Sequence, residues 1–272
     1  MAGMEIRNVS KSYPGTGRPV EALRGIDLAV TDGEFVAIVG PSGCGKSTLL
    51  YVIGGFIDCE GEVSVDGRRI TGPGTDRGIV FQEQALFPWL TVRRNILYGP
   101  ETRRVPVAER EREADRLIAT IGLRGFEDRF PRELSGGMRQ RVALARTLAC
   151  NPAILLLDEP FGALDAQTRE FMQDELMRIW HETRKTVLMI THDVDEAVYL
   201  AGRVLVMSAR PGRLVEEFEV DLDRSRPRED IVLSDRFRDL RNQVWLSVRR
   251  QAQRPEAAAR GGTADGTAAD AV

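Results

Sequence analysis

A glycine-rich loop offers the clearest chemistry in the sequence. Residues 40–48 read Gly-Pro-Ser-Gly-Cys-Gly-Lys-Ser-Thr, which fits the pattern GxxxxGK[ST]. In such a loop the backbone N–H groups surround phosphate oxygens, Lys46 reaches the β- and γ-phosphates of a nucleotide, and Ser47 can bind Mg²⁺. A chance glycine-rich turn is the alternative, but the chain has only three lysines and one of them occupies this position. The motif assigns nucleotide binding to Gly40, Pro41, Ser42, Gly43, Cys44, Gly45, Lys46, Ser47 and Thr48.

Two carboxylates follow a short apolar run. Asp158 and Glu159 come directly after the sequence Ile-Leu-Leu-Leu at 154–157. Open α/β sheets bind their ligands at the carboxyl ends of such buried strands. We expect Asp158 to hold Mg²⁺, directly or through water, and Glu159 to accept a proton from the water that attacks the γ-phosphate. Alone, the pair could equally be an acidic helix cap, but beside a phosphate loop the catalytic interpretation is favoured.

A second candidate anion site is the sequence Ser-Gly-Gly at 135–137. The apolar residues that follow it repeat with helical spacing, so Ser135 is expected to be the N-cap of a helix. Gly136 and Gly137 would then leave backbone N–H groups uncovered at the positive end of the helix dipole. By itself the motif is better explained as an ordinary capped helix.

The segments around these residues predict an α/β core that positions them. Continuous apolar runs at 35–39, 154–157 and 186–190 predict strands buried on both faces of a mostly parallel sheet. A helix is expected from Lys46 to about Gly54. Another helix is expected between the last two strands, with its inward face formed by Met172, Leu176, Ile179 and Trp180.

The remaining segments suggest the domain organisation. Residues 4–9 and 22–30 alternate like strands of an antiparallel sheet, and residues 85–150 are helical without a buried strand. We therefore expect an ATPase domain over 1–222 with a helical insertion at about 85–150, and a C-terminal extension over 223–250. The tail, 251–272, is expected to be disordered. The extension contains a short amphipathic segment near Phe237, Leu240, Val244 and Leu246.

Composition excludes several classes of protein. A net charge of -3 gives no general attraction to nucleic acid, and we expect no nucleic-acid partner. No apolar run approaches the ~20 residues that span a bilayer. Cys44, Cys59 and Cys150 are widely spaced, which indicates a reducing compartment rather than a disulfide framework. Because Cys44 lies in the phosphate loop, we expect bound nucleotide to shield its thiol from alkylation.

Taken together, the motifs resemble those of the ATP-binding subunit of ATP-binding cassette (ABC) transporters. The resemblance covers about residues 4–220 and rests on the order of the phosphate loop, Gln82, the Leu-Ser-Gly-Gly sequence at 134–137, the Asp-Glu pair at 158–159 and His192. It implies a P-loop NTPase with a RecA-like α/β core, an N-terminal antiparallel β subdomain and an inserted helical signature subdomain. It also implies a homodimer in which Ser135, Gly136 and Gly137 of one copy close over the ATP of the other.

The resemblance assigns further residues by position. Tyr13 matches the aromatic residue that stacks on adenine, although an ordinary strand residue is the alternative. Gln82 matches the glutamine that senses Mg²⁺ and the attacking water, and an inert exposed glutamine is the alternative. Asp165 matches a loop residue at the dimer interface, or else is simply a helix cap. His192 matches the switch histidine that contacts the γ-phosphate.

Three stretches narrow the resemblance to importers of nitrate, taurine and other aliphatic sulfonates, namely residues 72–78, 87–92 and 210–213. The resemblance implies that the stretch from Phe87 to Val92 contacts one of two transmembrane permease subunits, and that a separate protein binds the substrate. Trp89 would then be exposed, whereas packing inside the helical insertion is the alternative. The expected location is the cytoplasmic face of the inner membrane. A soluble ABC-type ATPase switch is the competing function.

Overall fold

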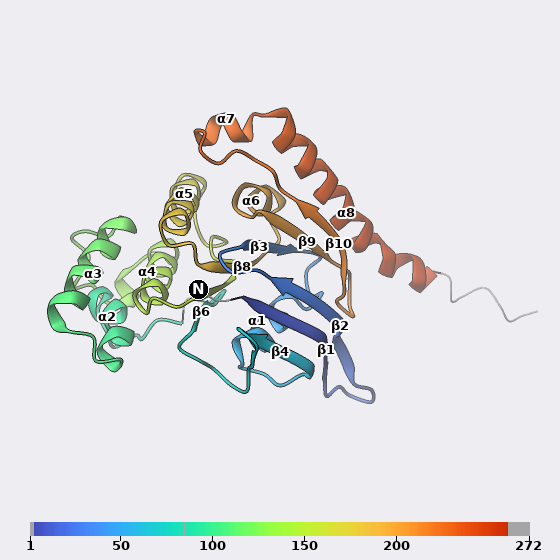
Figure 1. The fold of residues 1–272 in the computed structure, drawn as a ribbon, viewed down its shortest axis with the longest axis horizontal. Helices are drawn as coiled ribbons and strands as arrows, with labels where there is room; N and C mark the ends of the chain where they lie inside the picture. Colours follow the sequence, from blue (N-terminus) through green and yellow to red (C-terminus); the bar gives the residue numbers. More distant parts are fainter. Residues whose placement is uncertain (1–2, 84, 261–272) are drawn as a thin grey trace, which may run out of the picture.

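Six strands form the central sheet of the molecule (Figure 1), for which the computed structural model describes residues 3–83 and 85–260. The strand order is β10-β9-β3-β8-β7-β6, and all neighbours are parallel except β9 and β10. Every residue of β3, β7 and β8 is buried, which explains their nearly continuous apolar sequences. The strands are β3 (Phe35–Val39), β6 (Arg77–Val80), β7 (Ile154–Asp158), β8 (Thr186–Thr191), β9 (Arg203–Met207) and β10 (Leu214–Glu219).

Alternate residues of the central strands face two different hydrophobic clusters. Phe35 and Ala37 face the cluster formed with helices α2 to α8, whereas Val36 and Ile38 face the cluster formed with α1 (Lys46–Gly54) and a second sheet. That sheet is antiparallel, with the order β2-β1-β4-β5. Its strands are β1 (Met4–Tyr13), β2 (Val20–Val30), β4 (Glu60–Val65) and β5 (Arg68–Arg69).

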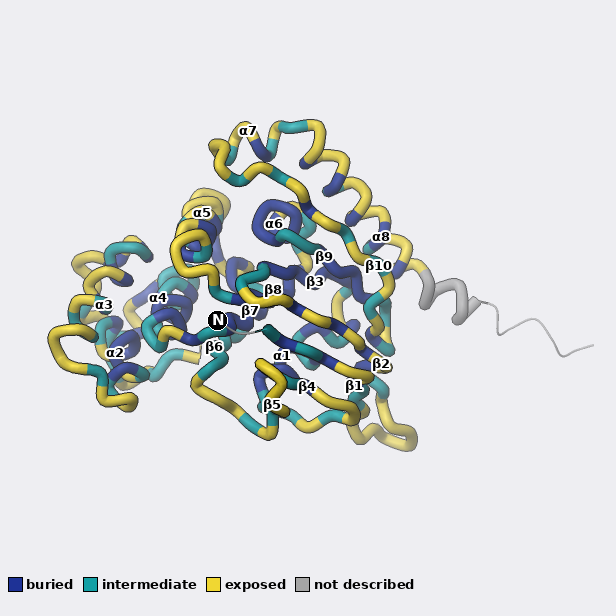
Figure 2. The backbone as a smooth tube through the Cα atoms, in the orientation of Figure 1, coloured by how far each residue is buried: buried dark blue, intermediate teal, exposed yellow. Residues whose placement is uncertain are grey.

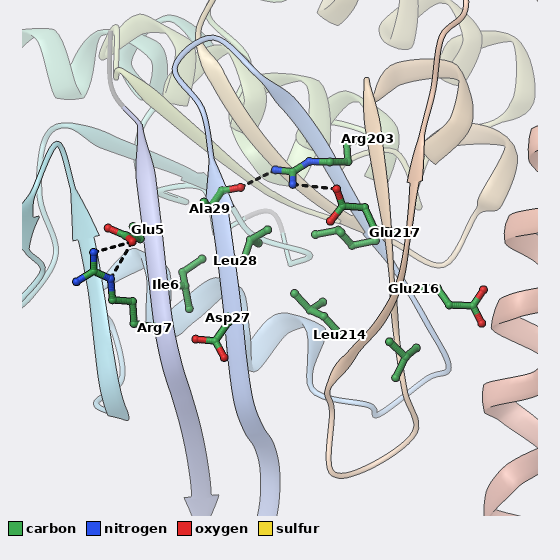
Figure 3. A pocket seen from close by; sticks show the side chains of 12 residues that line it. Glu5, Ile6, Arg7, Asp27, Leu28, Ala29, Arg203, Leu214, Glu216 and Glu217 are labelled. Carbon is green, nitrogen blue, oxygen red and sulfur yellow. Dashed lines mark hydrogen bonds and ion pairs between the residues drawn. The ribbon is translucent and has the colours of Figure 1, made fainter.

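Arg203 links the two sheets. Its guanidinium donates to the Ala29 carbonyl of β2 at 2.6 Å and pairs with Glu34 at 2.6 Å and with Glu217 of β10 at 3.2 Å. These contacts border a hollow of about 500 Å³ between β1–β2 and β9–β10, shown in Figure 3. No residue of the phosphate-loop motif lines this hollow.

The described chain between β6 and β7 contains helices and no strand. These are α2 (Val92–Thr102), α3 (Val107–Thr120), a 3-10 turn (Pro131–Glu133) and α4 (Gly136–Ala149). In Figure 1 they lie together on one side of the central sheet, away from the C-terminal helix. Ile96, Leu117 and Leu144 pack in the same cluster as the sheet residues, so this helical part shares the main core.

The C-terminal part adds α5 (Ala166–Thr183), α6 (Val194–Leu200), α7 (Arg228–Val232) and α8 (Asp235–Arg260). Figure 2 shows α6 as the most buried of them, whereas α7 combines exposed and partly buried residues with the buried Ile231. Helix α8 packs against α6, β9 and β10, and Phe237, Leu240 and Val244 form its buried face.

Two expectations for the C-terminus need correction. Leu246 is 52% exposed, because it lies about 200° around the helix from Val244, and Ser247 takes the inward position instead. Residues 251–260 were expected to be disordered but continue α8, and Gln251 is buried. The buried face of α8 therefore continues past its apolar residues through the polar residues Ser247 and Gln251. The rest of the expected tail, 261–272, lies outside the described residues.

Candidate functional site

A pocket of about 700 Å³ opens at the carboxyl ends of β3, β7 and β8. Most residues of the phosphate-loop motif meet there with Glu159, although Gly40, Pro41, Cys44 and Asp158 do not line its surface. Its lining consists of Tyr13, Pro14, Val20, Ala22, Ser42, Gly43, Gly45, Lys46, Ser47, Thr48, Gln82, Glu159, His192 and Arg210.

The phosphate loop is shaped by its glycines. Gly43 and Gly45 have φ of 72° and 109°, values that favour glycine. A Cβ at Gly45 would lie 2.8 Å from the Ala22 carbonyl oxygen, so the loop also packs closely on β2. Gly45 is the N-cap of α1 and provides no capping side chain, which leaves N–H groups of the first turn available to an anion.

Lys46 is held inside this loop. Its Nζ donates to the carbonyl oxygens of Gly40 at 2.9 Å and Pro41 at 3.1 Å, and the residue is 7% exposed. These neutral acceptors do not balance the ammonium charge. A phosphate oxygen would therefore be a stronger partner for the same group.

Asp158 and Ser47 form a candidate magnesium site. Ser47 Oγ donates to Asp158 Oδ1 at 3.1 Å, while the fully buried Asp158 has no hydrogen-bond partner for Oδ2 among the described residues. Burial raises the pKa of the Asp158 carboxyl. Burial and the nearby Asp158 charge raise the pKa of Tyr51 to about 12. An unpaired carboxylate oxygen beside a hydroxyl fits a hard divalent cation, which would compensate the buried charge.

Glu159 connects the ends of three adjacent strands. Its Oε2 accepts from Gln82 Nε2 at 3.1 Å, and its Oε1 lies 3.2 Å from His192 Nδ1. Gln82 follows β6, Glu159 follows β7 and His192 follows β8, and these strands are parallel neighbours. Glu159 has φ of 46°, a conformation that costs a non-glycine residue roughly 1 kcal/mol. The local fold thus tolerates strain at the carboxylate that the sequence selects as a base.

Tyr13 lies at the mouth of the pocket. It is 38% exposed, and its hydroxyl lies 3.5 Å from Thr48 Oγ1. The Lys11 ammonium lies 5.6 Å from its ring centroid. The ring is therefore accessible beside the start of α1, as stacking on a base would require.

The Ser-Gly-Gly sequence is not part of this pocket. Ser135 caps α4, and its Oγ accepts from the Met138 N–H at 3.2 Å. Gly137 instead faces the next loop, where an added Cβ would lie 3.1 Å from Leu164 Cδ2. In that loop Asp165 caps α5, and its bond from the Thr168 N–H lowers the pKa of the Asp165 carboxyl. A single copy of the chain does not bring these residues to the phosphate loop.

The structure corrects the expectation for Cys44. The residue is 1% exposed and packs in the cluster beneath the phosphate loop, with Sγ 3.9 Å from Lys46 Nζ. Burial raises the pKa of its thiol. Its backbone N–H is also engaged, donating to the Pro41 carbonyl at 3.3 Å. Because the small side chain fills the core side of the loop, the thiol does not face a bound nucleotide.

Arg210 is a pocket residue without an assigned role in the sequence motifs. It follows β9, and its Nη2 donates to the Gly43 carbonyl at 3.1 Å. Its position follows from the sheet, because residues after a parallel neighbour of β3 must lie close to the loop after β3. The pairing of β9 with β3 is a long-range contact, however, and periodicity does not reveal it.

Trp89 is 69% exposed, so the alternative that it packs inside the helical part is wrong. Its ring lies 5.6 Å from Phe87, which in turn lies 4.4 Å from Tyr98. The buried Asn95 fixes this loop by accepting from the Phe87 N–H at 2.9 Å and donating to the Leu90 carbonyl at 2.9 Å. The exposed aromatic group is thus presented by a well-ordered loop.

Comparisons with known proteins agree with this geometry. The family model described as ABC transporter matches residues 23–162. The chain is 50% identical to a nitrate import ATP-binding protein of Synechocystis over 80% of this chain and 83% of that protein. It is 42% identical to a taurine import ATP-binding protein of Roseobacter denitrificans over 90% of this chain and 95% of that protein. A solved dimeric ATP-binding cassette in a post-hydrolysis state with ADP and Pi is 35% identical, with a TM-score of 0.73, over 80% of this chain and 98% of that one. The expected fold class is confirmed.

Proposed function

Because the chain belongs to the ABC transporter family, we propose that it is the subunit that energises uptake of nitrate, or of taurine and related aliphatic sulfonates. The chain is an ATP-binding and ATP-hydrolysing protein of this family. The transported anion is proposed because two relatives with high coverage are named for nitrate and taurine import. A soluble ATPase switch is not favoured, since these relatives are named as import proteins.

The observation that best supports this proposal is the contact of Glu159 with both Gln82 and His192 in the pocket that contains the phosphate loop. In our proposal Glu159 accepts the proton of the attacking water, and Gln82 and His192 orient that water and the γ-phosphate. Lys46 and the N–H groups of residues 40–48 bind the phosphates, and Tyr13 stacks on the base. These groups stabilise the charge that develops in the transition state.

Ser47 and Asp158 would hold Mg²⁺, with Gln82 close to it. Held by these residues, a divalent cation would supply positive charge against the phosphate groups of the nucleotide. The protein itself contributes the fixed carboxylate Asp158, whose unpaired oxygen is already placed beside Ser47.

Hydrolysis is proposed to require a homodimer. Ser135, Gly136 and Gly137 lie outside the pocket of their own chain, and a helix N-terminus with uncovered N–H groups suits a γ-phosphate supplied by a second copy. Asp165, next to Gly137 through Leu164, would lie at the same interface. The dimer would close when ATP binds and open again after hydrolysis, and this cycle would drive transport.

The stretch from Phe87 to Val92, which includes Trp89, is the proposed contact of each copy of the chain with one of two permease subunits. Large aromatic side chains are enriched in interfaces, and Trp89 and Tyr98 are both exposed beside Phe87. None of the described helices is long and apolar enough to cross a bilayer. The proposed location is therefore peripheral, on the cytoplasmic face of the inner membrane, with substrate recognition left to a separate binding protein.

The proposal includes the domain boundaries expected from the sequence. Residues 1–222 would form the ATPase domain, with the helical insertion at about 85–150 carrying both the permease contact and the Ser-Gly-Gly site. Residues 223–250 would form an extension that packs on the core through α8.

The proposal is tested by tagging the chain, extracting it in mild detergent from membranes of its own organism and identifying the proteins that co-purify by mass spectrometry. We expect a polytopic membrane protein in an amount close to that of the tagged chain. Recovery of soluble partners alone would contradict the importer proposal while leaving ATP hydrolysis intact.

A further inference from the structure

The turn between β9 and β10 supports the phosphate loop from outside. The Gly212 N–H donates to the Ala22 carbonyl at 2.9 Å, and the Gly212 carbonyl accepts from the Arg24 N–H at 3.0 Å. A Cβ at Gly212 would lie 2.3 Å from the Cys44 carbonyl oxygen, so the backbone of the turn touches that of the phosphate loop. Ser208 Oγ closes the turn by accepting from the Arg213 N–H at 3.0 Å. The turn is thus fixed relative to the loop.

Arg210 extends from this fixed turn into the nucleotide pocket. Its only hydrogen bond among the described residues goes from Nη2 to the Gly43 carbonyl at 3.1 Å, and no described carboxylate pairs with it. A guanidinium has five N–H donors and stays protonated at any physiological pH. Most of its donors are therefore available to a ligand in the pocket.

The charge balance of the pocket identifies the ligand group. The described lining contains one lysine and one arginine: Lys46 lies inside the loop, whereas Arg210 is exposed. A nucleotide polyphosphate carries several negative charges, and guanidinium groups bind phosphate oxygens in a charge-assisted, often bidentate geometry. The Gly43 carbonyl orients Arg210 beside the loop that surrounds these phosphates.

We infer that Arg210 binds a polyphosphate oxygen of the bound nucleotide from the outer side of the phosphate loop. This inference depends on the ATP binding described above and adds a residue that the phosphate-binding motif does not contain. The alternative is that Arg210 only stabilises the phosphate loop through its hydrogen bond to the Gly43 carbonyl. The two roles predict a different salt dependence of nucleotide affinity. Salt screens an exposed contact between two charges, but it has little effect on a hydrogen bond to a neutral carbonyl.

The test measures ADP affinity by titration calorimetry for the wild-type chain, Arg210→Ala, Arg210→Lys and Arg213→Ala. ADP is chosen so that dimer closure on ATP does not contribute. Arg213 belongs to the same turn but does not line the pocket, so its variant removes equal charge without the contact. Thermal unfolding without nucleotide verifies that each variant is folded.

At 20 mM salt we expect Arg210→Ala to weaken ADP binding about tenfold, Arg210→Lys to weaken it less, and Arg213→Ala to leave it within about twofold of wild type. At 500 mM salt the tenfold difference should shrink to about threefold. An unchanged affinity for Arg210→Ala, or a loss that is the same at both salt concentrations, would overturn the inference. Failure of the wild type to bind ADP would instead refute nucleotide binding itself.

Discussion

The Glu159 carboxylate lies 3.2 Å from His192 Nδ1, although the two residues are separated by the whole of α5 in the chain. The contact exists because β7 and β8 are parallel neighbours whose carboxyl ends meet. Gln82 reaches the other oxygen of the same carboxylate from the end of β6. Three loops thus converge on the group that we assign as the base.

Replacing Glu159 with Gln should lower the rate of ATP hydrolysis at least 100-fold while ATP affinity stays within a few fold of wild type. The amide keeps the shape of the side chain and loses only its ability to accept a proton. Phosphate release and ATP titration measure the two quantities, and light scattering should detect an ATP-bound dimer. Hydrolysis at the wild-type rate would refute the role of Glu159.

Replacing Asp158 with Asn should stabilise the nucleotide-free chain by about 1 kcal/mol at neutral pH, measured in EDTA, because it removes a buried charge with one unpaired oxygen. The pKa of the Asp158 carboxyl is raised by burial from its usual 3.8. The native state therefore binds this proton more tightly than the unfolded state, and stability falls as pH rises through the interval between the two pKa values.

The pH dependence of the unfolding free energy tests this prediction for Asp158. The difference in unfolding free energy between wild type and Asp158→Asn should be smallest below pH 4 and grow as the pH rises above that value. In contrast, the variant should lose the gain in ATP affinity that Mg²⁺ gives the wild type. A variant that is less stable than wild type at pH 7, or that keeps full magnesium dependence, would contradict this account of Asp158.

Part of the fold and of the candidate site could be predicted from the sequence. The strands at 35–39 and 154–158 could be predicted nearly to the residue, because burial on both faces produces uninterrupted apolar runs. Glu159 could be assigned because it follows such a strand, whereas Gln82 and His192 were grouped with it through the resemblance to the ABC family. Arg210 could not be placed, because its position depends on the long-range pairing of β9 with β3. The direction of the Cys44 side chain was also missed, since a loop pattern does not state which side chains face the core.

Cys44 should resist alkylation in the folded chain both with and without ATP, since its thiol is buried and its pKa is raised by that burial. Cys59, which is partly exposed, serves as the internal reference. Mass spectrometry of peptides after brief treatment with iodoacetamide gives both labelling rates. Rapid labelling of Cys44 that ATP suppresses would show that the thiol faces the pocket.

Replacing Trp89 with Ala should abolish co-purification of the membrane component while the isolated chain hydrolyses ATP at an unchanged rate. Trp89 is exposed on a loop that Asn95 fixes, so its truncation removes contact area without disturbing the core. Trp245→Ala is the matched control, because Trp245 is 49% exposed on α8. In Figure 1 helix α8 lies on the other side of the molecule from α2, the helix that follows the Trp89 loop. Equal recovery of the membrane component with both variants would remove Trp89 from the interface.

Uptake by whole cells tests the central claim most directly. A strain that lacks this chain would be complemented with the wild type or with Glu159→Gln, and uptake of labelled taurine and nitrate would be measured in each. The account predicts that one of the two anions is taken up only with the wild-type chain. Uptake of both anions at the same rate in the deletion strain and in the complemented strains would contradict it.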